Sequence, residues 1–220
     1  MSIRRSVERF RAQAGARQVY QRSFVAHVHQ LLAAGFSQLE PKTLRDQEEP
    51  AITGLLVKAI RHYLEGPAAP QWSIAFAVHD DPPVEYQNRT GRARPRVDIE
   101  LERAQPGRRP RFQFEAKRLY RGDSINEYLG EDGLLSFLSG KYAAEHEDAG
   151  MLGYVQEQPV RDWVARIQQR MKDGADGFFL DARKGTWRSR ADPELEHSYS
   201  SLHMRAGRLL LIHHTFLECC

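Results

Sequence analysis

The chain has 220 residues, of which 41% are hydrophobic and 28% are charged. This composition suits one globular domain with a sizeable core and argues against a disordered chain. Lys and Arg number 32 against 29 Asp and Glu, so the formal net charge of +3 points to no particular partner. No apolar run approaches the roughly 18 residues that a membrane-spanning helix needs, so we expect no membrane partner.

Both cysteines, Cys219 and Cys220, are adjacent at the end of the sequence. Neighbouring cysteines rarely form a bridge that closes a useful loop. We therefore expect no structural disulfide and a reducing, cytoplasmic setting.

Positive charge is concentrated in two segments. Residues 1–22 hold six arginines and one acid, and residues 89–121 hold eleven Lys or Arg and four acids. These segments carry +5 and +7, which leaves −9 for the remaining residues if the whole chain is to sum to +3. Two basic blocks therefore accompany an acidic body.

The first 45 residues are predicted to form an N-terminal helical segment. Residues 1–22 read as a basic amphipathic helix, in preference to a cleaved targeting segment, because one helical face gathers apolar residues (Ile3, Val7 and Phe10). Residues 23–35 read as a second helix, with Ser23 at its N-cap and Gly35 at its C-terminal cap.

The next segment is predicted to contain a helix, a strand and a hairpin. The helix begins among acids and a proline near residue 46 and ends before Gly66, and a buried strand covers residues 72–78. After an arginine-rich loop at 84–95, residues 96–102 and 111–117 alternate between apolar and charged side chains. A Pro-Gly turn separates these two runs, so they form an antiparallel hairpin.

The remainder alternates between helical and strand patterns. We expect helices at 128–142 and 159–174 and strands at 151–155, 177–181 and 208–217. No internal repeat interrupts this pattern, so residues 46–220 read as one α/β domain.

The hairpin displays a group of residues suited to phosphodiester chemistry. Side chains alternate along a strand, so Glu115 and Lys117 share one face, and hairpin pairing brings Asp98 to the same edge. Two carboxylates from neighbouring strands form an oxygen site suited to Mg²⁺. The adjacent lysine supplies a charge that can orient water or stabilise a developing phosphate anion.

The segments Val97-Asp98-Ile99 and Phe114-Glu115-Ala116-Lys117 resemble the core motif of the PD-(D/E)XK superfamily, the restriction-endonuclease-like nucleases. A glutamate-bearing helix upstream and a helix and strand downstream follow the same order, while Val97 departs from the proline of the motif. The resemblance implies a restriction-endonuclease-like core at 46–220, with a mixed central sheet flanked by helices.

The resemblance also implies a catalytic set. Asp98 and Glu115 would ligate Mg²⁺, for which Mn²⁺ would substitute, and Lys117 would assist the attacking water. Glu49, or alternatively Glu48, would be the helix acid that contacts the metal or the water. The implied activity is metal-dependent endonucleolytic hydrolysis of nucleic acid, with DNA favoured over RNA.

Each of these residues also has a purely structural interpretation. The acids and Lys117 could form a solvated strand face with cross-strand ion pairs. Glu100 could be an additional ligand or a surface charge, and Gln113 could orient water or simply occupy a polar strand position. Arginines around the hairpin read as phosphate contacts or as a soluble basic loop; the set comprises Arg92, Arg94, Arg96, Arg108, Arg109, Arg118 and Arg121.

We therefore expect a Mg²⁺-dependent nuclease, with bacterial restriction or antiphage defence as its setting. The alternative is a catalytically inactive nuclease fold that binds nucleic acid or a partner protein. Cutting both strands of a duplex would require a homodimer or sequential nicking. The C-terminal histidines lack the paired ligand spacing of zinc sites, so we assign them no metal (His197, His203, His213 and His214).

Overall fold

A computed structural model describes residues 3–180, 187–189 and 195–220, with side chains from residue 19 onward. The helices are α1 (Ile3–Phe36), α2 (Pro41–Leu44), α3 (Glu49–Glu65), α4 (Ser124–Leu129), α5 (Leu134–Leu138) and α6 (Val160–Asp173), with short 3-10 turns η1 (Gln71–Ala75) and η2 (Gly91–Ala93). The strands are β1 (Phe76–Asp80), β2 (Ile99–Arg103), β3 (Arg111–Leu119), β4 (Asp148–Val155), β5 (Arg188–Ser189), β6 (Ser198–Arg205) and β7 (Arg208–Glu218).

The strands form one mixed sheet in the order β1-β2-β3-β4-β7-β6-β5. The two ends of the sheet are antiparallel, whereas β3, β4 and β7 run parallel in its centre. The predicted α/β architecture with a mixed sheet flanked by helices is confirmed.

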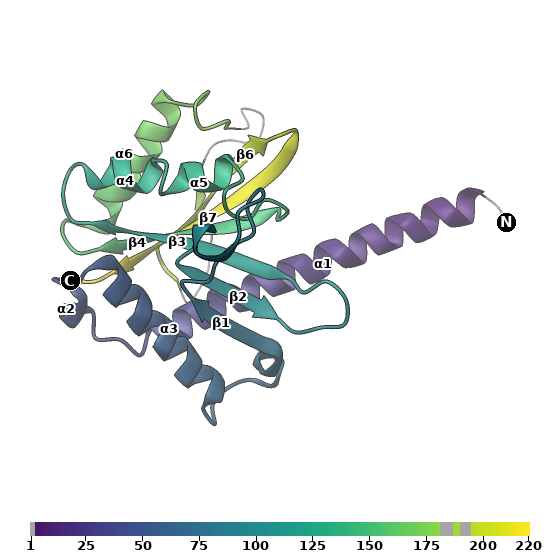
Figure 1. Ribbon diagram of the computed structural model, residues 1–220, viewed down its shortest axis with the longest axis horizontal. Helices are drawn as coiled ribbons and strands as arrows, with labels where there is room; N and C mark the ends of the chain where they lie inside the picture. The colour runs from purple at the N-terminus through teal and green to yellow at the C-terminus, as the bar shows by residue number, and fades with distance from the viewer. Residues whose placement is uncertain (1–2, 181–186, 190–194) are drawn as a thin grey trace.

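Helices cover both faces of this sheet (Figure 1). On one face, α1 and α3 bury apolar side chains such as Leu31, Leu56 and Ile60 against Phe112 and Phe114 of β3. On the other face, the apolar cluster is formed by α4, α5 and α6 with residues of β4 and β7. Burial of apolar surface on both faces explains why the central strand β4 is an almost continuous apolar run rather than an alternating one.

The close approach of β3 to β4 depends on a glycine. A Cβ atom at Gly150 would lie 2.1 Å from the ring of Phe114, so a larger residue would displace a core aromatic side chain. Phe114 is fully buried. Gly150 therefore allows the strand that bears Glu115 to pack its aromatic face tightly.

The N-terminal segment is one continuous helix, so the predicted break at Ser23 is wrong. α1 passes through Ser23 and ends at Phe36, and its N-terminal half extends away from the body of the molecule (Figure 1). Gly35 serves packing rather than capping, because a Cβ atom there would lie 2.4 Å from the side chain of Ile60 on α3. No new N-cap is needed before the apolar residues at 24–32, because the helix is already formed by the residues that precede them.

The predicted helix at 128–142 is also wrong as a single element, because the chain forms α4 and α5 with a sharp turn between them. Gly130 ends α4 by donating its N–H to the carbonyl of Glu127 at 3.3 Å. Gly133 then passes so close to α4 that a Cβ atom would lie 2.3 Å from the carbonyl oxygen of Tyr128. The glycines allow the chain to fold back, which the regular spacing of apolar residues concealed.

Several strand predictions need correction. Residues 71–75 form a 3-10 turn, so the strand expected at 72–78 begins at Phe76, and β2 begins at Ile99 rather than residue 96. At 177–181 a turn leads to a single bridge between Leu180 and His203, and residue 181 lies outside the described residues. The strand β6 was missed, because its inward side chains are polar and give no apolar alternation.

The remaining predicted elements are present. The hairpin of β2 and β3, the strand β4, the helix α6 and the strand β7 all lie within a few residues of their expected limits. Cys219 is buried and Cys220 exposed, and both are free thiols. None of the helices in the described ranges combines the length and apolar character required to cross a membrane.

Candidate active site

The hairpin brings Asp98 and Glu115 together. Ile99 of β2 pairs with Phe114 of β3, so the preceding residue, Asp98, lies opposite Glu115. The backbone N–H of Ala116 donates a 2.6 Å hydrogen bond to Oδ2 of Asp98. The carbonyl of Asp98 in turn accepts the N–H of Asp81 at 2.9 Å. Asp98 is therefore held at the edge of β3 by both its side chain and its backbone.

Lys117 joins a third carboxylate to this pair. Its Nζ lies 2.8 Å from Oε1 of Glu115 and 3.1 Å from Oε1 of Glu49, the first residue of α3. It also donates to the carbonyl of Ala116 at 2.6 Å. Four residues from three separate segments thus form one group, which we call the carboxylate–lysine cluster (Asp98, Glu115, Lys117 and Glu49).

The other candidate acids lie outside this cluster. Glu48 is the N-cap residue of α3, and its exposed carboxylate pairs with Arg118 at 3.0 Å. Glu100 accepts a 2.7 Å hydrogen bond from Nε2 of Gln113, whose Oε1 accepts the N–H of Ala143 at 2.7 Å. Glu100 and Gln113 therefore bond to each other and to the loop after α5.

Burial perturbs the ionisation of the cluster. Burial and the nearby charge of Asp98 together raise the pKa of Glu115 to about 8, despite the opposing effect of Lys117. Burial also raises the pKa of Asp98 and of Glu49. Burial opposes the charge on Lys117, but the three carboxylates outweigh it and raise the pKa of its ammonium. The cluster therefore has one firmly protonated cation and carboxylates that would be stabilised by further positive charge.

The carboxylate–lysine cluster fits a divalent cation. Oε2 of Glu115 is buried and has no hydrogen-bond partner, and only about one-twentieth of the residue is exposed. Such an atom normally has a partner, so it is a natural position for a ligand bond. Within the described residues no group of three or more His, Cys, Asp or Glu side chains is arranged to hold a metal. Mg²⁺ needs fewer, because it retains several waters and binds through one or two carboxylates together with substrate phosphate.

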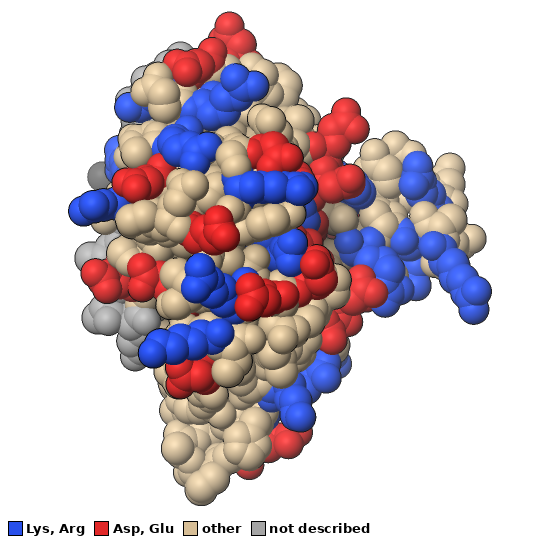
Figure 2. Space-filling model, turned by 90° about the vertical axis from the view of Figure 1, so that its left-hand side faces the viewer, with Lys and Arg blue, Asp and Glu red and all other residues tan. Residues whose placement is uncertain are grey.

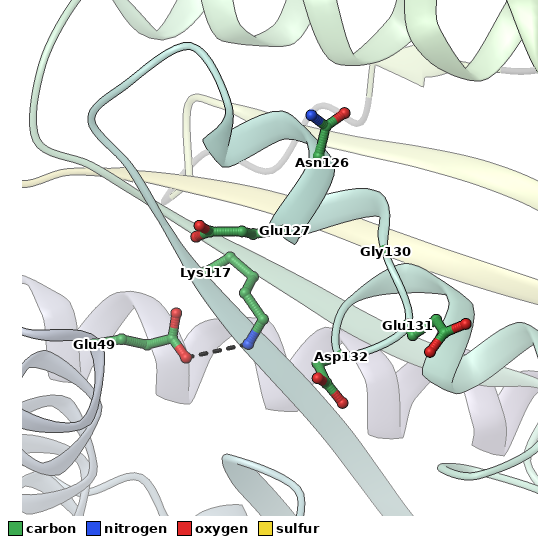
Figure 3. Close-up of a pocket in the computed structure, with 7 residues that line it drawn as sticks. All are labelled: Glu49, Lys117, Asn126, Glu127, Gly130, Glu131 and Asp132. Atoms are coloured by element: carbon green, nitrogen blue, oxygen red, sulfur yellow. Dashed lines mark hydrogen bonds and ion pairs between the residues drawn. The ribbon is translucent and has the colours of Figure 1, made fainter.

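A pocket of about 360 Å³ opens beside Lys117 and Glu49. Figure 3 shows that α4 and the loop after it form the opposite wall. Three of the residues that line this wall are acidic: Glu127, Glu131 and Asp132. The pocket therefore lies between the carboxylate–lysine cluster and a wall that carries three acidic residues.

Most of the candidate arginines are paired with acids. Arg96 bonds to Asp81, and Arg108 bonds to Glu145 at 2.5 Å, both at exposed positions. Four further ion pairs are Arg109 with Glu102, Arg118 with Glu48, and Arg121 with both Asp123 and Glu127. Figure 2 likewise shows Lys or Arg interspersed with Asp or Glu over one face of the molecule. Among the described residues, only Arg92 and Arg94 of the candidate set form no ion pair.

Sequence reasoning missed Tyr142. Its hydroxyl donates a 2.6 Å hydrogen bond to the carbonyl of Arg96, two residues before Asp98. Burial raises the pKa of this phenol, and the charges of Glu115 and Asp98 raise it further. Tyr142 lies in the loop after α5, and its distance in sequence from the hairpin gives no indication of this contact.

Two of the C-terminal histidines, His203 and His214, belong to a second polar group, and Met151 of β4 lies between His214 and Glu115 in the sheet. The Oγ of Ser201 lies 2.7 Å from Nε2 of His203 and 2.7 Å from Nε2 of His214. Nδ1 of His214 lies 2.9 Å from the hydroxyl of Tyr128, and Nδ1 of His203 donates to the carbonyl of Phe178 at 2.7 Å. All four side chains are buried, and we call them the histidine–serine chain (Tyr128, His214, Ser201 and His203).

Comparisons of the chain with protein-family models, curated proteins and solved structures find no match. The site geometry and the sequence motif are therefore the basis for any functional assignment.

Proposed function

We propose that the protein is a Mg²⁺-dependent nuclease of the PD-(D/E)XK type, acting on DNA. One observation carries the proposal: Asp98 and Glu115 lie opposite each other, and an oxygen of Glu115 is buried without a partner beside the ammonium of Lys117. Buried carboxylate oxygens normally have a hydrogen-bond partner, so the unpartnered oxygen favours a ligand site over a purely structural ion-pair network.

Asp98 and Glu115 would hold the metal. Bound there, Mg²⁺ would polarise a phosphoryl oxygen and lower the pKa of a coordinated water. Asp98 is well placed because the N–H of Ala116 occupies only one of its two oxygens. The hydrogen bonds from Lys117 likewise leave Oε2 of Glu115 free.

Lys117 would act as a fixed cation. Because neighbouring carboxylates raise its pKa, the amine stays protonated and donates hydrogen bonds rather than removing a proton. Its ammonium can orient water and offset the negative charge that develops on the phosphate. Glu49 holds this ammonium from α3, so the helix start fixes the direction in which the lysine points.

The decisive experiment is cleavage of plasmid and linear single-stranded DNA with Mg²⁺, Mn²⁺ or EDTA. We expect cleavage by the wild type only with metal, and at least about a 100-fold loss of rate in Glu115→Gln. Glu102→Gln is a matched control, since Glu102 is another buried strand glutamate but pairs with Arg109 and Arg111. Its cleavage rate should stay near that of the wild type.

Two results would overturn the proposal. Undiminished cleavage by Glu115→Gln would show that the activity arises elsewhere. DNA binding without metal uptake in calorimetry, and without cleavage, would instead favour the alternative of an inactive binding module.

A further inference from the structure

The arginines of the basic segment 89–121 fall into two groups. Those from Arg96 onward are paired with acids, or, for Arg103, stacked on the rings of Tyr20 and Phe76. Within the described part of the chain, Arg89, Arg92 and Arg94 form no ion pair. Arg89 lies over the ring of Tyr86, a contact that leaves guanidinium donors available.

These three arginines belong to one loop with a defined base. Residues 85–95 connect two short paired segments, in which Pro83 bridges Arg96 and the N–H of Val84 donates to the carbonyl of Pro95 at 2.8 Å. Val84 is buried in the apolar cluster under α4, α5 and α6. The loop is therefore anchored at both ends. Between these ends, the side chains of Arg89 and Arg92 are exposed to solvent.

The base of this loop leads directly into the candidate site. Arg94 precedes Asp98 by four residues, which limits the separation of their Cα atoms to about 14 Å. Tyr142 fixes the intervening segment through its bond to the carbonyl of Arg96. Arg94 is thus close enough to the proposed metal ligand Asp98 to contact a phosphate adjacent to one held by the metal.

The opposite side of the site has the opposite charge. Beside Lys117, the pocket wall carries Glu127, Glu131 and Asp132. Arg121 offsets Glu127 and Lys141 offsets Asp132, but no ion pair to Glu131 occurs among the described residues. Loop 85–95 carries three arginines and one acid, Glu85, for a net charge of +2, so a polyanion is attracted more strongly there than on the α4 side.

We propose that loop 85–95, which connects β1 to β2 along the chain (Figure 1), is the phosphate-binding element. Duplex DNA lies along this loop, and its phosphates contact Arg89, Arg92 and Arg94. This inference builds on the proposed nuclease function, since it names the surface that delivers the substrate. Ion-paired arginines contribute less to DNA binding, because each must break its ion pair with a carboxylate before it can contact a phosphate.

The test measures binding without cleavage. Fluorescence anisotropy with a labelled 30-base-pair duplex is performed in EDTA, on the Glu115→Gln protein. We expect the added changes Arg89→Ala, Arg92→Ala and Arg94→Ala to weaken binding at least about tenfold and to reduce the salt slope by about 2.7, because three phosphate contacts are lost. Thermal unfolding of both proteins verifies that the fold is retained.

The matched control removes the same charge from ion-paired positions. Arg108→Ala, Arg121→Ala and Arg161→Ala eliminate three exposed arginines that pair with acids. We expect this triple variant to keep most of the affinity and of the salt slope. Equal losses in both triple variants would overturn the inference, because net charge alone would then explain binding.

The two proposals fail differently. If wild-type protein cleaves DNA but the loop variant binds as well as its parent, the loop assignment is wrong and the nuclease proposal stands. If the wild type never cleaves but the loop variant loses binding, the loop assignment stands and the nuclease proposal is wrong.

Discussion

Two buried polar groups on the same sheet differ in how completely they are satisfied. In the histidine–serine chain, Nδ1 of His203 must donate, because its partner is a carbonyl. With both histidines neutral, Ser201 then donates to His203, His214 donates to Ser201, and Tyr128 donates to His214. Every donor in the chain therefore has one acceptor.

The carboxylate–lysine cluster has no such closure. Three acids face one ammonium, and an oxygen of Glu115 lacks a partner. The comparison shows that burial of polar groups does not by itself indicate function. A closed network is satisfied within the protein itself, whereas an open and charged one leaves an atom that a ligand can bind.

The largest effect should come from breaking the open cluster at its cation. We expect Lys117→Met to lower the free energy of unfolding by about 3–5 kcal/mol at pH 9, above the pKa of about 8 of Glu115, because buried carboxylates lose their counter-charge. Urea unfolding in EDTA measures this change. A stability equal to that of the wild type would show that the acids are already neutral or solvated.

Metal should close the open cluster. At a Mg²⁺ concentration of 100 times its Kd, we expect the wild type to gain about 2.7 kcal/mol of unfolding free energy. Glu115→Gln should lose most of this gain, while Ser201→Ala should keep it. Thermal unfolding with and without Mg²⁺ provides the measurement, and an identical gain in Glu115→Gln would place the metal elsewhere.

Breaking the closed network should reduce stability without affecting cleavage. Ser201→Ala leaves ring nitrogens of His203 and His214 without partners, which should cost about 1–3 kcal/mol. Cleavage per folded molecule should stay unchanged, because Ser201 lies outside the carboxylate–lysine cluster. A large loss of cleavage by stable, folded Ser201→Ala protein would connect the two groups.

The smallest effects per pH unit should be opposite responses to pH. Burial lowers the pKa of His203 to about 4, and it also lowers the pKa of His214. As pH falls, the unfolded chain therefore binds protons at these histidines before the folded protein does. His203 should therefore reduce stability by up to about 1.4 kcal/mol per unit as pH falls from about 6.5 to 4, and His214 should act in the same direction. Urea unfolding of His203→Gln should show a shallower acid loss.

Glu115 should act in the other direction. Because its pKa in the folded state is raised to about 8, the folded protein binds its proton more tightly than the unfolded chain does. In EDTA, this group should therefore stabilise the protein as pH falls from about 8 to 4.5, at up to about 1.4 kcal/mol per unit. Glu115→Gln removes the contribution, and an unchanged pH profile would contradict the raised pKa.

The hairpin could be predicted from the sequence, because the alternation of apolar and polar side chains along each strand involves only neighbouring residues. Alternation of Phe112, Phe114 and Ala116 with charged residues defines a strand with one apolar face, and the intervening Pro-Gly turn sets antiparallel pairing. Asp98, Glu115 and Lys117 follow from that geometry. The folded-back turn after α4 and the polar strand β6 were not readable, because close packing and cross-strand hydrogen bonds decide them.

The sequence by itself determined the α/β class, the hairpin and the proximity of Asp98 to Glu115, because strand periodicity and short connections are properties of neighbouring residues. Only the tertiary structure decided that Glu49 reaches Lys117, that Glu48 faces Arg118, and which arginines are paired. The first two contacts join residues about 70 positions apart in the chain, so their formation depends on how α3 packs on the sheet.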